Sequence, residues 1–152
     1  MKKLALAAVL SIAFAAPAMA GTLSYEVRGG DYVGQGFADP VAGVVVGEDF
    51  DLAQHTFVGA NVAADKILAS GSHVMFTANA RAGVNFDQGN RFYGFAGYAT
   101  TPCATCVGGA DLGAGFEHNF TAGIYGKVEY ARYLDKGVAD ANQYRAAVGI
   151  RF

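Results

Sequence analysis

Apolar and polar residues alternate along much of the chain with a period of two. The longest regular run spans residues 73–86, where one parity is apolar throughout and the other holds polar, charged or small side chains. Residues 143–152 repeat the pattern, with Val148 on the apolar parity and Arg145 on the polar one. Because successive side chains of a β-strand point to opposite faces, both segments are predicted to be strands with one apolar and one polar face.

The same periodicity, interrupted by turn and loop residues, predicts eight strands. These are Thr22–Tyr32, Val41–Asp49, Gln54–Ala63, 73–86, Arg91–Thr100, Ala110–Glu117, Ala122–Leu134 and Gln143–Phe152. The facing of the second and fifth strands stays open, because apolar side chains occupy both of their parities. Eight consecutive strands of this kind favour an all-β fold, an eight-stranded antiparallel up-and-down barrel.

Short and long connections alternate along this predicted barrel. Short turns are predicted at Phe50–Ala53, Asp87–Asn90 and His118–Phe120. Longer loops are predicted at Gly34–Asp39, Ala64–Gly71, Thr101–Gly109 and Asp135–Asn142. If both termini lie at one rim, all four long loops lie at the opposite rim, which is the asymmetry of barrels with short periplasmic turns and longer outer loops.

The polar parities of the predicted strands collect charges of both signs. They are Glu26, Arg28, Arg81, Glu117, Lys127, Glu129, Arg145 and Arg151. In a soluble barrel these side chains would face water and the apolar parity would form the core. In a transmembrane barrel they would pair inside the lumen and the apolar parity would face lipid. Alternation alone fits both arrangements.

Composition favours the transmembrane arrangement. Hydrophobic residues make up 53% of the chain and charged residues 16%, yet beyond residue 20 no apolar run approaches the ~20 residues of a membrane helix. The apolar parity is dominated by Ala and Val, with aromatic residues near strand ends, rather than by the Leu and Ile of a soluble core. The 21 glycines make room inside a narrow barrel, and the 8 tyrosines suit membrane interfaces.

The first twenty residues have the pattern of a secretory signal peptide. Lys2 and Lys3 precede the apolar run Leu4–Ala16, and Ala18–Ala20 forms an A-x-A cleavage site. Residues 1–20 are therefore predicted to be removed, which leaves one barrel domain at 21–152. Without the two lysines, nine basic residues remain against 13 acidic ones, a net charge of −4. The chain has no basic patch, so nucleic acid is not expected as a partner.

Three short segments are similar to those of the small outer-membrane β-barrels of Gram-negative bacteria. They are Gly113–Glu117, Val128–Tyr130 and Val148–Phe152. This family includes OmpA-type transmembrane domains, OmpX-like proteins and opacity-type porin-family proteins. The resemblance implies a location in the cell outer membrane, among its lipids and lipopolysaccharide. It also implies that Phe152 forms part of the signal read by the barrel-assembly machinery.

Few residues suggest site chemistry. Cys103 and Cys106 form a C-x-x-C motif inside a predicted loop, which in an exported protein indicates a small loop disulfide or two idle thiols. A zinc site would need two more ligands. His55, His73 and His118 are isolated, and although Ser70 and Ser72 lie near His73, nothing orients an imidazole toward a hydroxyl. No enzyme activity, metal or cofactor is predicted.

The expected function follows from the barrel's size. The interior of an eight-stranded barrel is just wide enough for its own side chains, so a filled lumen is predicted rather than an open channel. We therefore expect a structural or adhesin-like role through the outer loops, with host or cell-surface ligands as candidate partners. A small-solute porin is the alternative, and a lipid A-modifying enzyme is a more distant one.

Overall fold

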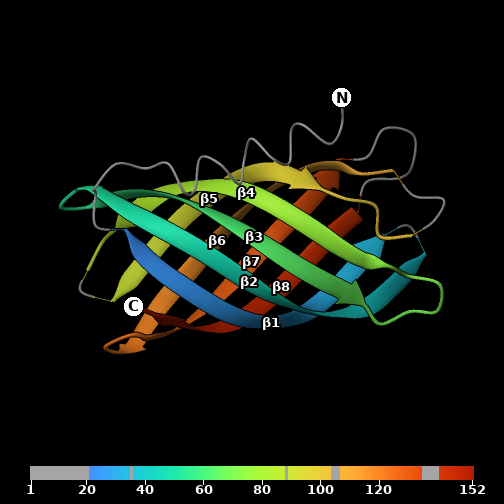
Figure 1. Ribbon diagram of the computed structural model, residues 1–152, viewed down its shortest axis with the longest axis horizontal. Coiled ribbons are helices and arrows are strands. Elements are labelled where there is room, and N and C mark those ends of the chain that lie inside the picture. The colour runs from blue at the N-terminus through green and yellow to red at the C-terminus, as the bar shows by residue number, and fades with distance from the viewer. Residues whose placement is uncertain (1–20, 35, 88, 104–106, 135–140) are drawn as a thin grey trace.

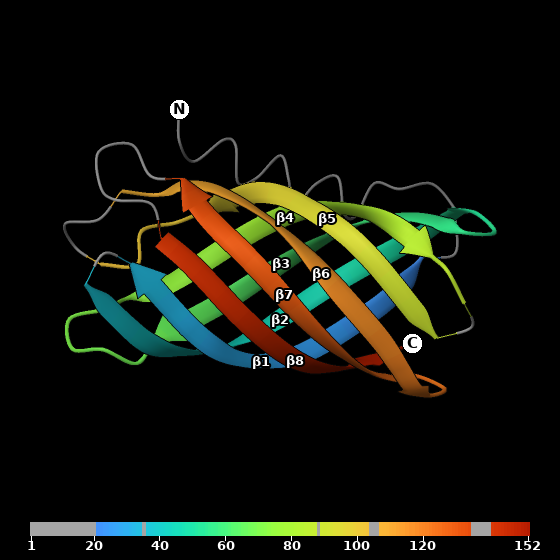
Figure 2. The same ribbon diagram turned by 180° about the vertical axis from the view of Figure 1, so that it is seen from behind.

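Eight antiparallel strands close into a barrel in sequence order in the computed structural model, which describes residues 21–34, 36–87, 89–103, 107–134 and 141–152 (Figures 1 and 2). The strands are β1 (Thr22–Gly34), β2 (Phe37–Ala53), β3 (Thr56–Ile67), β4 (Val74–Asn85), β5 (Asn90–Ala99), β6 (Gly109–Thr121), β7 (Ile124–Leu134) and β8 (Ala141–Arg151). β8 pairs with β1 from Ser24↔Arg151 to Val33↔Asn142, so the sheet has no free edge. The predicted fold class is confirmed. Within the described ranges, no helix is both long and apolar enough to cross a membrane.

Several predicted connections are wrong, because the strands run further than expected. Gly34 pairs with Phe37, so most of the predicted loop Gly34–Asp39 belongs to a tight β1–β2 hairpin, and the predicted alternation of long and short connections fails there. β3 extends to Ile67 and takes in the first half of the loop predicted at Ala64–Gly71. Asp65, one of the polar residues that suggested a loop there, points into the barrel.

The predicted turns at Phe50–Ala53 and His118–Phe120 are also strand. β2 reaches Ala53 and β6 reaches Thr121, each with a register irregularity at its end. The β6–β7 reversal falls at Gly123, whose φ of 87° is a conformation that side chains disfavour.

The structure settles the facing of the two ambiguous strands. On β2, Val41 and Val45 are buried inside, while Val44 and Val46 are exposed on the outer wall. On β5, the inward set is Arg91, Tyr93, Phe95 and Ala99, and the outward set includes Phe92 and Tyr98. The fifth strand looked apolar on both parities because aromatic rings face inward as well as outward.

The outer wall is apolar around the whole barrel. Large hydrophobic side chains from every strand are exposed on it, with Val27 at 64%, Val128 at 56% and Val148 at 54%. Aromatic pairs lie toward the barrel ends, such as Tyr25 with Phe152 and Tyr130 with Tyr144, at ring-centroid distances of 6.0 and 5.4 Å. A continuous apolar wall of this extent is unusual on a monomer in water and is typical of a lipid-facing surface.

Inside the barrel, four aromatic rings each lie directly opposite a glycine on the neighbouring strand. The cross-strand pairs are Phe57↔Gly83, Tyr93↔Gly115, Phe95↔Gly113 and Tyr125↔Gly149. A Cβ added at each glycine would lie 2.3–2.9 Å from the ring opposite. The glycines therefore provide the space in which the rings lie against the barrel wall.

Candidate functional site

The lumen holds a balanced set of buried charges. All eight charged residues picked out by parity point inward; Arg151 is half-buried and the other seven are buried. Four further inward-facing charges were not in the predicted set: Asp49, Asp65, Arg91 and Asp111. Apart from Asp39 at the mouth, the buried or half-buried lumen charges among the described residues are thus six cations and six anions. Extending the two-residue parity of β3 into the predicted loop would have found Asp65.

One cluster fills the middle of the lumen around Glu129 on β7. Its carboxylate lies 3.1 Å from Lys127 Nζ, 3.1 Å from Arg145 Nε and 3.8 Å from Arg28 Nη1, and it accepts a hydrogen bond of 2.7 Å from the Tyr93 hydroxyl. These partners come from β1, β5, β7 and β8, so the cluster spans the interior.

Two more carboxylates complete this cluster. Glu26 pairs with Lys127 at 2.5 Å and accepts a 2.7 Å hydrogen bond from the Tyr125 hydroxyl. Asp65 receives both donors of the Arg28 guanidinium fork, with Nε at 2.7 Å from Oδ1 and Nη2 on Oδ2. A bidentate pair of this kind fixes orientation as well as charge.

A second cluster lies toward the end where β1 begins and β8 ends. Arg81 donates to both oxygens of Asp49 at 2.7 and 2.8 Å, and Arg91 Nη1 reaches Asp49 Oδ2 at 2.9 Å. On the other side of this end, Arg151 Nη2 donates to Glu117 Oε1 at 2.6 Å. Each cluster joins strands that are not neighbours in the sheet.

Aromatic rings lie against the guanidinium groups of several lumen arginines. The Arg91 carbon Cζ lies 4.3 Å from the centre of the Phe57 ring, and that of Arg151 lies 4.4 Å from the Tyr125 ring. Arg145 lies over Phe95 at 5.2 Å. These contacts are within cation–π range, so the rings opposite the glycines also help to hold the buried charges.

The buried ion pairs and aromatic rings together fill the lumen as a packed plug. Desolvation offsets much of the Coulombic gain of a buried ion pair, whereas removing one partner leaves an uncompensated charge. The network therefore ties the strands together across the lumen, and its members depend on one another.

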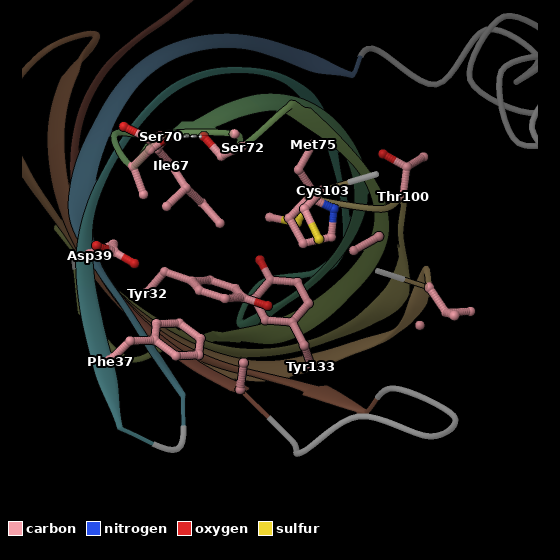
Figure 3. Close-up of a pocket in the computed structure, with 17 residues that line it drawn as sticks. Tyr32, Phe37, Asp39, Ile67, Ser70, Ser72, Met75, Thr100, Cys103 and Tyr133 are labelled. Atoms are coloured by element: carbon pink, nitrogen blue, oxygen red, sulfur yellow. Dashed lines mark hydrogen bonds between the residues drawn. The ribbon is translucent and has the colours of Figure 1, made fainter. Parts of the chain in front are cut away.

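Above the plug, the lumen opens into a cavity of about 360 Å³ at the end where β1 ends and β8 begins (Figure 3). Its floor is apolar and includes Ile67, Met75 and Tyr133, which are all buried. Tyr133 closes the floor onto the plug, since its hydroxyl donates to Gln143 Oε1 at 2.5 Å. This cavity was not foreseen, because it needs strand ends that the sequence presented as loops.

The residues considered for chemistry are scattered. His55 Nδ1 lies 3.2 Å from the Asn85 carbonyl oxygen, and His118 Nδ1 lies 2.8 Å from Asn90 Oδ1. The backbone N–H of His73 donates to the carbonyl oxygen of Pro102. In the part of the chain that the structure describes, no three His, Cys, Asp or Glu side chains are grouped so as to hold a metal ion.

Nearby loop residues have structural contacts. Ser72 Oγ accepts a 2.9 Å hydrogen bond from Lys66 Nζ and donates to the Ala69 carbonyl oxygen, so its hydroxyl closes the loop. Ser72 also forms an isolated bridge with Cys103. Cys106 lies outside the described residues, so the Cys103–Cys106 disulfide stays a prediction.

Known structures share this fold at low sequence identity. No protein-family model and no curated protein sequence matches the chain. The attachment invasion locus protein Ail of Yersinia pestis aligns with 12% identity and a TM-score of 0.63, over 87% of this chain and 97% of Ail; a second structure of Ail holds the heparin analogue sucrose octasulfate. Neisserial surface protein A aligns with 12% identity and a TM-score of 0.59 over the same shares.

Two further matches extend this likeness. The N-terminal β-barrel domain of Pseudomonas aeruginosa OprF has 16% identity and a TM-score of 0.59, over 85% of this chain and 97% of that domain. A barrel from the de novo design of transmembrane β-barrels has 15% identity and a TM-score of 0.55, over 86% of this chain and 95% of the design. The fold is therefore that of small eight-stranded transmembrane barrels.

Proposed function

We propose that this chain is an outer-membrane β-barrel protein with a filled lumen, acting in membrane structure or in surface contact through its outer loops. The observation that carries the proposal is the network of ion pairs across the lumen, combined with an outer wall that is apolar on all strands. A wall of that kind needs lipid around it, and a lumen crossed by buried ion pairs offers solutes no free path.

The outer membrane is the membrane that fits these features. The solved structures with this fold include an attachment protein, a surface protein and the barrel domain of OprF. The predicted signal peptide would direct export. The role of Phe152 in assembly remains a prediction; its ring packs edge-on against Tyr25 at the rim of the barrel.

Surface contact would take place at the rim where β1 ends and β8 begins. Residues 68–73 and 100–103 lie around the mouth there, joined by the Ser72–Cys103 bridge. Ail binds a heparin analogue, but the described residues that line the cavity inside this mouth include no Lys, Arg or His. We therefore expect the cavity to make contacts of a different chemistry from sulfated sugars.

Two measurements test the location and fold together. A folded membrane barrel should be recovered in the outer-membrane fraction and should change gel mobility on boiling in detergent. Recovery in the soluble periplasmic fraction without a mobility change would refute the proposal.

A third measurement separates the filled plug from a porin. In planar bilayers, the wild-type protein should show no stable conductance steps. A matched variant with Arg28, Glu129 and Arg145 all replaced by serine, which removes three charged members of the central cluster, should conduct. Reproducible nanosiemens steps from the wild type would favour the porin.

A fourth measurement tests the enzyme alternative. The mass spectrum of lipid A should be the same in cells with and without the protein, and a new lipid A species would favour an enzyme.

A further inference from the structure

The cavity at the mouth is separate from the ion-pair plug. It lies above the floor formed by Ile67, Met75 and Tyr133, and none of the twelve plug charges lines it. It is open to solvent at the rim, and its volume of about 360 Å³ suits a small molecule. The plug does not require such a cavity.

One side of the cavity is an aromatic wall, formed by Tyr32 on β1, Phe37 on β2 and Tyr133 on β7 (Figure 3). The Tyr32 ring stacks on Phe37 with centroids 6.0 Å apart and lies 5.5 Å from the Tyr133 ring. Phe37 is 45% exposed, so part of the wall is open to an incoming ligand. Aromatic ring faces carry partial negative charge and attract cations.

A carboxylate stands beside this wall. Asp39 is the direct cross-strand partner of Tyr32, lines the cavity and is half-buried. Among the described residues, no side chain forms an ion pair or hydrogen bond with its carboxylate, whereas Asp49 and Asp65 below it are each held by arginine. The seventeen described lining residues include no Lys, Arg or His. The described lining therefore has one negative charge and no cation to balance it.

We propose that this cavity binds small organic cations, that is, an ammonium group attached to a compact apolar group. The ammonium would lie between the aromatic wall and Asp39, and the apolar part would rest on Ile67 and Met75. Coulombic attraction to one carboxylate and cation–π attraction to the rings act on the same charge. The same features disfavour anions such as sulfated sugars.

The binding experiment uses the protein in lipid nanodiscs, since detergent could occupy an apolar cavity. The probe is benzyltrimethylammonium, compared with its uncharged isostere neopentylbenzene and with the anion phenylacetate, by calorimetry at low salt. The cation should bind at least tenfold more tightly than either of the others. Asp39→Asn should weaken its binding about five-fold and Phe37→Leu about three-fold, and added salt should weaken it further.

The matched control is Asp31→Asn, which removes one carboxylate from the same hairpin. Asp31 neighbours Tyr32 but is exposed on the other parity, so its loss should leave affinity unchanged. A labelled methionine methyl reports where the probe sits, because Met75 lies in the cavity floor and Met75→Leu identifies its signal. The cation should shift that signal.

Three results would overturn the proposal. They are equal binding of the cation and neopentylbenzene, equal losses in the Asp39 and Asp31 variants, and binding that leaves the Met75 signal unmoved. Heat-modifiable gel mobility of each variant confirms that it is folded. The assay uses the isolated barrel, so its outcome does not depend on the cellular location or on the surface role proposed above.

Discussion

Glu129 is the member of the lumen network whose loss should cost most. Its carboxylate is surrounded by Lys127, Arg145 and Arg28, at 3.1, 3.1 and 3.8 Å. Glu129→Gln keeps the shape of the side chain and an oxygen for the Tyr93 hydroxyl, but removes the negative charge. The substitution therefore removes the charge, and the acceptor that faces Arg145 and Arg28, with little change of shape.

The three cations would be affected unequally. Lys127 keeps Glu26 at 2.5 Å, and Arg28 keeps its bidentate contact with Asp65. Arg145 keeps a 3.5 Å contact with Gln143, the Phe95 ring and the longer-range attraction of Asp111, but no other ion pair within 4 Å among the described residues. Leaving one buried cation without its ion pair costs about 3–5 kcal/mol. With an m value of about 2 kcal/mol per M, the urea midpoint should fall by roughly 2 M.

The assay is urea unfolding in lipid vesicles, followed by gel mobility and by circular dichroism. The control Glu48→Gln removes a carboxylate from β2 outside the lumen and should change stability by less than about 0.5 kcal/mol. Adding Arg145→Met to Glu129→Gln should recover much of the loss, because the orphaned cation is then removed. A loss below about 1 kcal/mol for Glu129→Gln, or no recovery in the double variant, would refute the reasoning.

Three other predictions concern the wall, the packing and a turn. Val128→Arg on the outer wall should destabilise the barrel in vesicles by about 2–4 kcal/mol, and Ile124→Arg, near the rim, by less than about 1 kcal/mol; equal effects in urea titrations would contradict a lipid-facing wall. Gly115→Ala should cost about 1–3 kcal/mol in the same assay, because its Cβ would meet the tyrosine ring opposite. Hydrogen bonds from the Asn90 side chain and from the backbone N–H groups of Gly89 and Asn90 lower the pKa of Asp87. A carboxyl NMR titration should therefore place the midpoint of Asp87 below the usual value for an aspartate. The support that Asp87 gives the turn is then present at neutral pH and lost as the pH falls through this lowered pKa.

The fold could be predicted because one face of most strands meets lipid. Alternation along β4 and β8 identified the outward side chains, and eight repeats of the pattern implied closure. Alternation did not predict the facing of β5, because Tyr93 and Phe95 point into the lumen and both faces of that strand are therefore apolar. Some strand ends were predicted as loops because polar residues such as Asp65 lie there. These residues face inward and pair with partners that are distant in the sequence.

The lumen site could be predicted in part for the same reason. Parity identified charges on well-patterned strands, such as Glu129 and Arg145. It missed Asp49 and Arg91, which lie on the two strands of uncertain facing. The mouth cavity could not be predicted, since it depends on Tyr32, Phe37 and Asp39 meeting across a hairpin that the sequence presented as a loop.

The rings opposite glycines have a consequence for the width of the barrel. Sliding one strand by two residues preserves which side chains face inward, so alternation cannot choose among such slips. Sliding β6 by two against β5 would set Phe95 opposite Asp111 or move it onto Gly115, the place of the Tyr93 ring. The stagger summed around a barrel sets the tilt of its strands and its diameter. The four ring-and-glycine pairs therefore favour one register between their strands. Because the register sets the shear of the sheet, these glycines help to specify the diameter of the barrel.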